Sequence, residues 1–192
     1  GKEIHAWARS HEHLFEICDV VLLLVAASAV RSVRSVHLSN CNQRVGACIN
    51  APSLEHLMEQ CQSLKALKLD YQVLDEDYFR VIGEFSKPGL EIELTECQIT
   101  GDTAVLAAVL ESNRGPTKLD RCYMDSSVFF ATGLRGNSRL KSLRHVINRS
   151  GHDDGQQEVL EIAGALKENK GLVELDFIDD FKEMSDEPWY AV

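Results

Sequence analysis

The sequence predicts an α/β solenoid in which repeated strand–helix units form a parallel β-sheet on a concave face and a row of helices on a convex face. Three observations lead to this prediction. A strand-like phrase of spaced apolar residues recurs along the 192 residues. Segments between its copies carry apolar residues at helical spacing. A further phrase, which joins each helix to the next strand, recurs as well.

The strand-like phrase reads apolar, two spacers, apolar, one spacer, apolar. Its clear copies begin at Val33, Leu64, Leu140 and Leu172, and degraded copies begin at Gly89 and Arg114. The middle apolar position serves as a marker at Val36, Leu67, Ile92, Thr117, Leu143 and Leu175. Neighbouring markers are 25 to 32 residues apart, which fits one strand and one helix per unit. Pro116 falls inside a predicted strand, where its missing N–H predicts a bulge.

Three segments between the strand phrases predict amphipathic helices, within 75–85, 103–110 and 156–166. The residues expected to face the core are Tyr78, Phe79, Ile82 and Phe85, then Val105, Leu106, Val109 and Leu110, then Val159, Ile162, Ala163 and Leu166. The expected N-caps are Thr100 or Asp102, and Asp125, Ser126 or Ser127, because their side-chain oxygens accept from first-turn amides.

The phrase between helix and strand occurs as LESNRGPTKL, LRGNSRLKSL and LKENKGLVEL. Its first Leu ends the apolar face of a helix, and its last Leu begins the next strand. Asn113, Asn137 and Asn169 lie between, and Cys61 takes the same place in MEQCQSLKAL. We expect these residues to turn the chain through a left-handed or capped conformation.

Five residues beyond each marker lies a side chain that can form hydrogen bonds. These positions are Cys41, Gln72, Cys97, Cys122, Asn148 and Asp180. Stacked from unit to unit, such side chains would satisfy backbone groups freed where the chain leaves the strand. The whole pattern, L-x-x-L-x-L-x-x-N/C, resembles leucine-rich repeats of the ribonuclease-inhibitor-like and cysteine-containing kinds. The resemblance covers about Val33 to Val192 and implies a horseshoe segment with an extended concave surface for binding proteins.

Two regions are expected. Residues 1–32 form an N-terminal helical or capping segment or a degenerate first repeat, and 33–192 form an array of about six strand-bearing repeats. Val20–Val30 is apolar but has eleven residues, where a membrane-spanning helix needs about 20, so it predicts a buried helix or strand. The first residue is Gly1, and the last residues read like the opening of another helix, so we expect a fragment of a longer array.

Composition restricts the partners. A formal net charge of −10 disfavours nucleic acid, whose phosphates attract Lys and Arg, and it disfavours membrane surfaces. The six cysteines are explained as bend residues or small buried side chains, although a Cys41–Cys48 disulfide stays open. Reduced thiols favour a cytoplasmic location. Secretion stays open because the native N-terminus is expected to be missing.

The candidates for chemistry each have a simpler explanation. His5, His11, His13 and Cys18 invite a metal interpretation, but His11 and His13 point in different directions on a helix. A solvated helix start explains them better. The acids of HDDG (152–155) suit the first turn of a helix better than a calcium loop. Asn148 also fits a glycosylation sequon, and a bend explains it equally well. No motif indicates a metal, a cofactor or catalysis.

The position directly after each marker should face outward on the concave sheet. It reads His37, Lys68, Glu93, Lys118, Arg144 and Asp176, so five of the six positions carry a formal charge. A solvated strand face would also be polar. The sharper interpretation is a stripe that binds a protein partner, and it favours a non-catalytic interaction module such as a scaffold, inhibitor or sensor domain. The alternatives are a regulatory domain of an enzyme whose catalytic residues lie elsewhere, or a cysteine-dependent activity. The sequence names neither the partner nor the oligomeric state.

Overall fold

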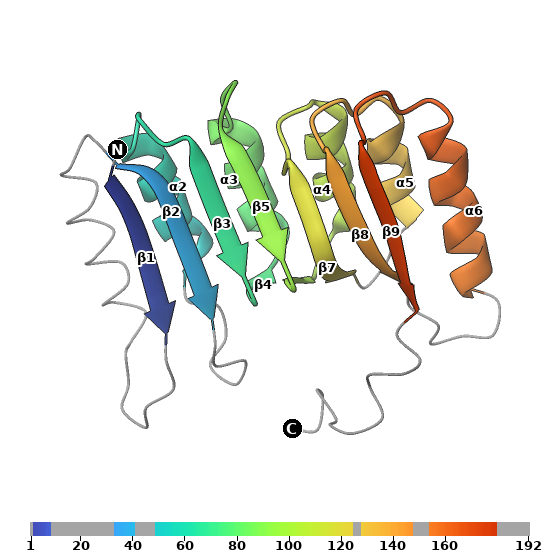
Figure 1. Cartoon of the computed structure of the whole chain (residues 1–192), viewed down its shortest axis with the longest axis horizontal. Helices are drawn as coiled ribbons and strands as arrows, with labels where there is room; N and C mark the ends of the chain where they lie inside the picture. Colours follow the sequence, from blue (N-terminus) through green and yellow to red (C-terminus); the bar gives the residue numbers. More distant parts are fainter. Residues whose placement is uncertain (1, 9–32, 41–48, 125–127, 148–153, 180–192) are drawn as a thin grey trace.

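The computed structural model describes residues 2–8, 33–40, 49–124, 128–147 and 154–179. These residues form an open sheet with helices against one of its faces (Figure 1). Every strand pairing in the sheet is parallel. The predicted α/β class with a parallel sheet is therefore confirmed at this level of detail.

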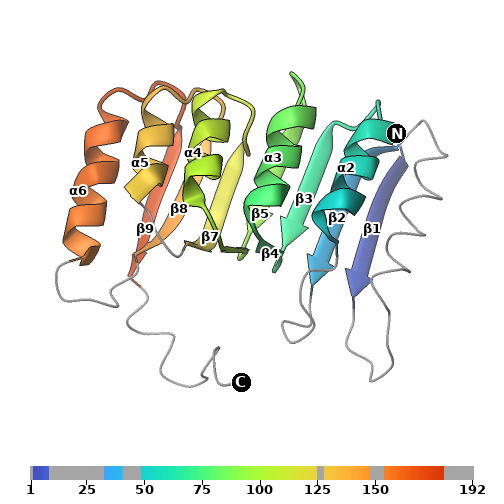
Figure 2. The ribbon, with the colours of Figure 1, turned by 180° about the vertical axis from the view of Figure 1, so that it is seen from behind.

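The long strands lie side by side in the order of the sequence. They are β1 (Lys2–Ala8), β2 (Val33–Asn40), β3 (Ala66–Asp70), β5 (Glu91–Thr95), β7 (Lys118–Met124), β8 (Ser142–Ile147) and β9 (Glu174–Asp179). Parallel neighbours need a crossover, and a helix supplies it between each successive pair of long strands from β2 to β9. The helices are α2 (Ala51–Gln60), α3 (Glu76–Phe85), α4 (Thr103–Glu111), α5 (Val128–Arg135) and α6 (Asp154–Leu166), and all cover the same face (Figure 2). Of these helices, none is long and apolar enough to cross a bilayer.

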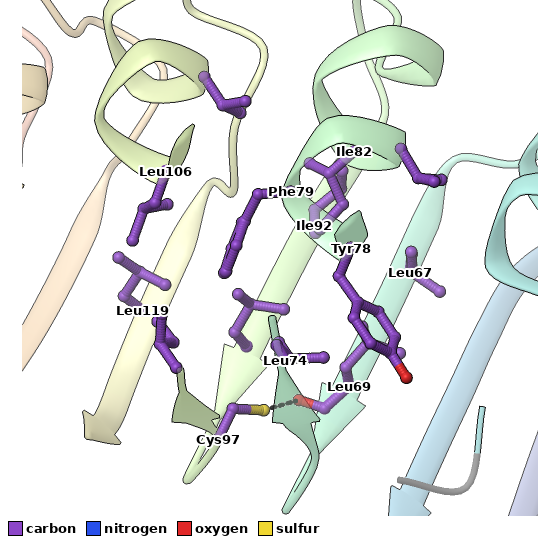
Figure 3. Packing of buried hydrophobic residues seen from close by; sticks show 14 of the residues in the cluster. Leu67, Leu69, Leu74, Tyr78, Phe79, Ile82, Ile92, Cys97, Leu106 and Leu119 are labelled. Atoms are coloured by element: carbon purple, nitrogen blue, oxygen red, sulfur yellow. Dashed lines mark hydrogen bonds between the residues drawn. The ribbon is translucent and has the colours of Figure 1, made fainter. Parts of the chain in front are cut away.

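The core lies between the sheet and the helices. Alternate strand residues point toward the helices, so the apolar positions at and after each marker are buried together. The markers Val36, Leu67, Ile92 and Leu143 are at most 1% exposed, whereas Leu175 in the last strand, β9, is 43% exposed. Figure 3 shows Phe79 and Ile82 of α3 and Leu106 of α4 packed against the sheet.

The helix predictions are confirmed in α3 and α4. Asp75 caps α3 by accepting from the amides of Asp77 and Tyr78. Asp102, one of the two predicted candidates, caps α4 by accepting from the Ala104 amide at 2.9 Å. The predicted caps Asp125, Ser126 and Ser127 lie outside the described residues.

In α6 one predicted core residue is wrong. Ala163 is exposed, and Ala165 is buried beside Ile162. Consecutive helical residues point about 100° apart, so Ala163 leaves the buried face that residues three apart share.

The sheet contains two elements that the strand phrase does not indicate. β4 (Val73–Leu74) and β6 (Gln98–Ile99) follow β3 and β5 after a short bend. β4 pairs with β6, and β6 pairs with the end of β7. The chain therefore makes a second row of parallel pairs beyond the carboxyl ends of β3 and β5.

The register at β7 differs from the prediction. Thr117 lies across from Ile92, because Glu93 pairs with Lys118, but the marker Leu143 pairs with Leu119. The last two strands are therefore offset by two residues from the predicted alignment. Pro116 lies before β7 and so breaks no bond within it.

The Thr117 side chain, just before β7 begins, forms hydrogen bonds with the backbone of the neighbouring strand. Its hydroxyl accepts from the Ile92 amide at 3.0 Å and donates to the Ile92 carbonyl at 2.9 Å. The polar side chain thus bonds the neighbouring strand at the position where an apolar marker would fill the core. This role explains why the repeat tolerates a threonine at this marker.

Candidate functional site

The candidate site is the face of the sheet opposite the helices, which we call the open face. Its side chains alternate with the core residues and form rows across neighbouring strands. One row consists of His37, Lys68, Glu93, Lys118 and Ser142, and the next consists of Ser39, Asp70, Thr95, Asp120, Arg144 and Asp176. The predicted stripe is therefore wrong as a single row, since Arg144 and Asp176 belong to the second.

The register offset has a physical benefit at Asp120. The predicted alignment would place Lys118 beside Arg144, which would bring like charges together. In the structure, Arg144 lies across from Asp120, and its Nη1 is 3.4 Å from the Asp120 Oδ1. Its Nε is also 3.2 Å from the Asp176 Oδ2. The offset therefore exchanges a repulsive neighbour, Lys118, for an attractive one, Asp120, whereas Asp176 would face Arg144 in either alignment.

Asp120 is the centre of a group of charges. Its side chain is only 12% exposed, and besides Arg144 it contacts Lys118 and Arg121. The Lys118 Nζ is 3.3 Å from its Oδ2, and the Arg121 Nε is 3.5 Å from its Oδ1. A nearly buried carboxylate needs such partners, because burial without them is costly. The three cations are thus required by the protein itself.

A second centre lies at Asp70, on β3. The His37 Nε2 is 2.5 Å from its Oδ2, and the Lys68 Nζ is 3.8 Å from the same oxygen. Lys68 and Lys118 thus behave alike, since each reaches the acid two residues further along its own strand. Four of the predicted contact residues therefore form ion pairs with Asp70 or Asp120 of the sheet. They are His37, Lys68, Lys118 and Arg144.

A third row was missed by the sequence prediction. It consists of Tyr71 and Glu96, which follow β3 and β5, and Arg121, which lies at a register shift within β7; their φ values are 56°, 50° and 53°. This left-handed conformation costs a non-glycine residue about 1–2 kcal/mol. The Arg121 Nη2 is 2.5 Å from the Glu96 Oε1, and Tyr71 forms a side-chain hydrogen bond with Glu96. Only the common spacing of four residues from each marker could have indicated this row.

The bend positions form a ladder of donors along the carboxyl edge of the sheet. Gln72 Nε2 donates to the Asp70 carbonyl at 2.9 Å. The Cys97 thiol lies 3.3 Å from the Leu69 carbonyl and 3.4 Å from the Thr95 carbonyl, and the Cys122 thiol lies 3.5 Å from the Leu94 carbonyl. Each thiol therefore lies within hydrogen-bonding distance of a carbonyl group on the preceding strand and of one on its own strand. Cys41, Asn148 and Asp180 lie outside the residues whose structure is described.

Asparagines form a corresponding ladder at the opposite edge. Asn137 donates to the Leu110 carbonyl, at the end of α4, and accepts from the Leu140 amide at 2.7 Å. Asn169 donates to the Leu134 carbonyl at 2.6 Å, at the end of α5, and accepts from the Leu172 amide at 2.9 Å. Each amide group therefore joins a helix end to the start of the next strand.

The described thiols are poor nucleophiles. Cys61, Cys97 and Cys122 are free and buried. Burial raises the pKa of Cys97 well above its ordinary value, and the hydrogen bond and charge of Cys122 raise it further. Burial also raises the pKa of Cys61, although Lys87 opposes this change. Since the thiolate is the reactive form, these environments suit packing better than catalysis.

This pKa shift predicts a stability that depends on pH. In the unfolded chain Cys97 loses its proton near the ordinary pKa of 9.0, whereas the folded state keeps that proton to higher pH. The free energy of unfolding should therefore fall as pH rises above 9.0. Urea unfolding at pH 7, 9 and 10 would measure this. Cys97→Ala should lose less stability over that range, and an unchanged pH dependence in the variant would contradict the assignment.

Within the described ranges, no group of three His, Cys, Asp or Glu side chains is arranged to hold a metal ion. His11, His13, Cys18, His152 and the side chain of His5 lie outside the description. A scan against models of known protein families finds no match, and a search of curated proteins finds no similar sequence. The candidate site therefore depends on its geometry alone.

Proposed function

We propose that the chain is a leucine-rich-repeat solenoid that binds a protein partner on its open face, without catalysis. The repeat assignment is supported by the strand–helix units, the buried markers and the two ladders at the sheet edges. In such an array each unit buries its core only against its neighbours, which leaves the outer side of the sheet available as an extended surface.

The observation that carries this proposal is the ordered charge of the open face. The cationic side chains Lys68, Lys118, Arg121 and Arg144 are 37–46% exposed and are held at fixed positions by carboxylates beneath them. Held side chains lose less freedom on binding, so their contacts cost less to form.

A cysteine-dependent activity has less support. Such an activity needs a thiolate that a substrate can reach, and the three described cysteines are buried, with pKa values raised at Cys61 and Cys97. A regulatory role within a larger enzyme would use the same open face for contact. It is therefore a special case of the binding proposal.

Placing a bulky residue on the open face tests the proposal. Ala66→Trp adds an indole at the start of β3, where the present side chain is small and half-buried. We expect this change to reduce capture of partner proteins by at least about tenfold, because an interface cannot close over a misplaced indole. Quantitative affinity capture with cross-linking would measure it.

Ala163→Trp is the matched control, since Ala163 is exposed on α6 in the helix layer. It should leave the captured set unchanged. Both variants should show the melting temperature of the unmodified chain. If Ala66→Trp captures the same proteins in the same amounts, the open face is not the binding surface.

A further inference from the structure

The open face has an excess of negative charge that the protein does not neutralise itself. Among the described side chains, its rows hold seven acids and four bases, which leave a net charge of −3 when His37 is neutral. The acids are Asp70, Glu91, Glu93, Glu96, Asp120, Glu174 and Asp176, and the bases are Lys68, Lys118, Arg121 and Arg144. Arg34 and Lys65 are exposed one residue before the row of Ser35, Ala66 and Glu91, and they are not part of this count.

All four bases are committed to internal ion pairs. Glu91, Glu93 and Glu174, by contrast, form no ion pair with any residue that the structure describes. Glu93 is the clearest case. It lies across from both Lys68 and Lys118, but both lysines reach toward the nearly buried Asp70 and Asp120.

This preference has a physical reason. A cation gains more from a carboxylate that is shielded from water than from one that stands in solvent. The side chains of Asp70 and Asp120 are 11% and 12% exposed, whereas Glu91 is exposed and Glu93 is half-buried. The shielded acids therefore take the lysines, and the accessible acids keep their charge.

We propose that the partner presents basic side chains to the open face, with Lys or Arg placed over Glu91 and Glu93 and a further cation over Glu174. This inference rests on the proposed binding function and specifies the chemistry of the partner. Glu93 and Glu174 are separated by three strand spacings, or about 14 Å. The partner is therefore a protein segment with cationic groups at least that far apart. Ser35 and Ala66 share the row of Glu91 and leave it accessible.

Synthetic peptides of opposite charge test this chemistry directly. We expect fluorescein-labelled decalysine to bind the intact chain at low ionic strength, and decaglutamate not to bind. Glu91→Gln combined with Glu93→Gln should weaken decalysine binding about fivefold or more, as expected when two exposed ion pairs are lost. Fluorescence anisotropy titrations would give the dissociation constants, and added salt should weaken binding.

The matched control is Glu111→Gln combined with Glu168→Gln, since both residues are exposed and lie outside the rows of the open face, at the end of α4 and just after α6. It changes the net charge by the same amount and should weaken binding less than twofold. Equal weakening by the two pairs would mean that decalysine responds only to total charge, which would overturn the inference. Binding of decaglutamate in place of decalysine would overturn it as well.

Partner capture separates the two proposals. If Ala66→Trp abolishes capture and the Glu91→Gln, Glu93→Gln pair leaves it unchanged, the open face binds a partner but the cationic chemistry is wrong. If both changes reduce capture, both proposals are supported. If Ala66→Trp leaves capture unchanged, the binding function and this inference fail together.

Discussion

Replacing Asn137 with alanine should lower the free energy of unfolding by about 3–5 kcal/mol, because three backbone groups would lose their partner. Asn137 is 1% exposed. Its side chain donates to the Leu110 carbonyl and accepts from the amides of Arg139 at 3.0 Å and Leu140 at 2.7 Å. Water cannot replace the amide group at a site this buried without first opening the structure. Equilibrium urea unfolding would measure the loss.

Asn113 provides the control, since it is the exposed asparagine of the same phrase. Its φ of 57° suits glycine, so Asn113→Gly avoids backbone strain and removes only the contacts of its side chain with Ser138. We expect this variant to lose about 1 kcal/mol or less. Equal losses at the two positions would show that the asparagine ladder contributes little to stability.

The asparagines show how far the sequence could predict this fold. The recurring phrase correctly placed a turn between each helix and the next strand. The expected left-handed conformation occurs at Asn113, but Asn137 and Asn169 turn the chain through side-chain hydrogen bonds. Both mechanisms use the same residue type, so the sequence alone could not distinguish them.

The open face was predictable in its composition but not in its register. Alternation next to the buried markers identifies which residues face outward. It does not reveal the two-residue offset, because Leu119 fits the core beside Leu143 as well as the predicted partner Thr117 would. The offset places Arg144 beside Asp120, and no feature of the sequence near either residue indicates that contact.

The shorter features were beyond prediction for a different reason. β4 and β6 have two residues each, too few to show any periodicity. Tyr71, Glu96 and Arg121 are not residues that favour a left-handed conformation, so propensity argues against the one they adopt. Neighbouring strands impose it, since the amides of Tyr71 and Glu96 donate to carbonyls of the next strand.

Reversing two charges beside Asp120 should also lower the free energy of unfolding by about 3–5 kcal/mol. In the Lys118→Glu, Arg144→Glu variant, the nearly buried carboxylate loses two of its three cations and gains two acidic neighbours. The remaining contact, with Arg121, is shared with Glu96. Urea unfolding at pH 7 would measure the change, and partner capture by this variant would be uninterpretable until its stability is known.

Adding Asp120→Asn to that variant should restore most of the lost stability, because the neutral amide no longer needs a cation. The control is Arg135→Glu with Lys167→Glu, which makes the same change in net charge at exposed sites at the end of α5 and just after α6. It should alter the free energy of unfolding by no more than about 0.5 kcal/mol. If Asp120→Asn gives no rescue, the loss comes from the new glutamates themselves, and Asp120 is not what holds Lys118 and Arg144 in place. A full rescue would mean that Lys118 and Arg144 are retained because they neutralise Asp120 in the folded state.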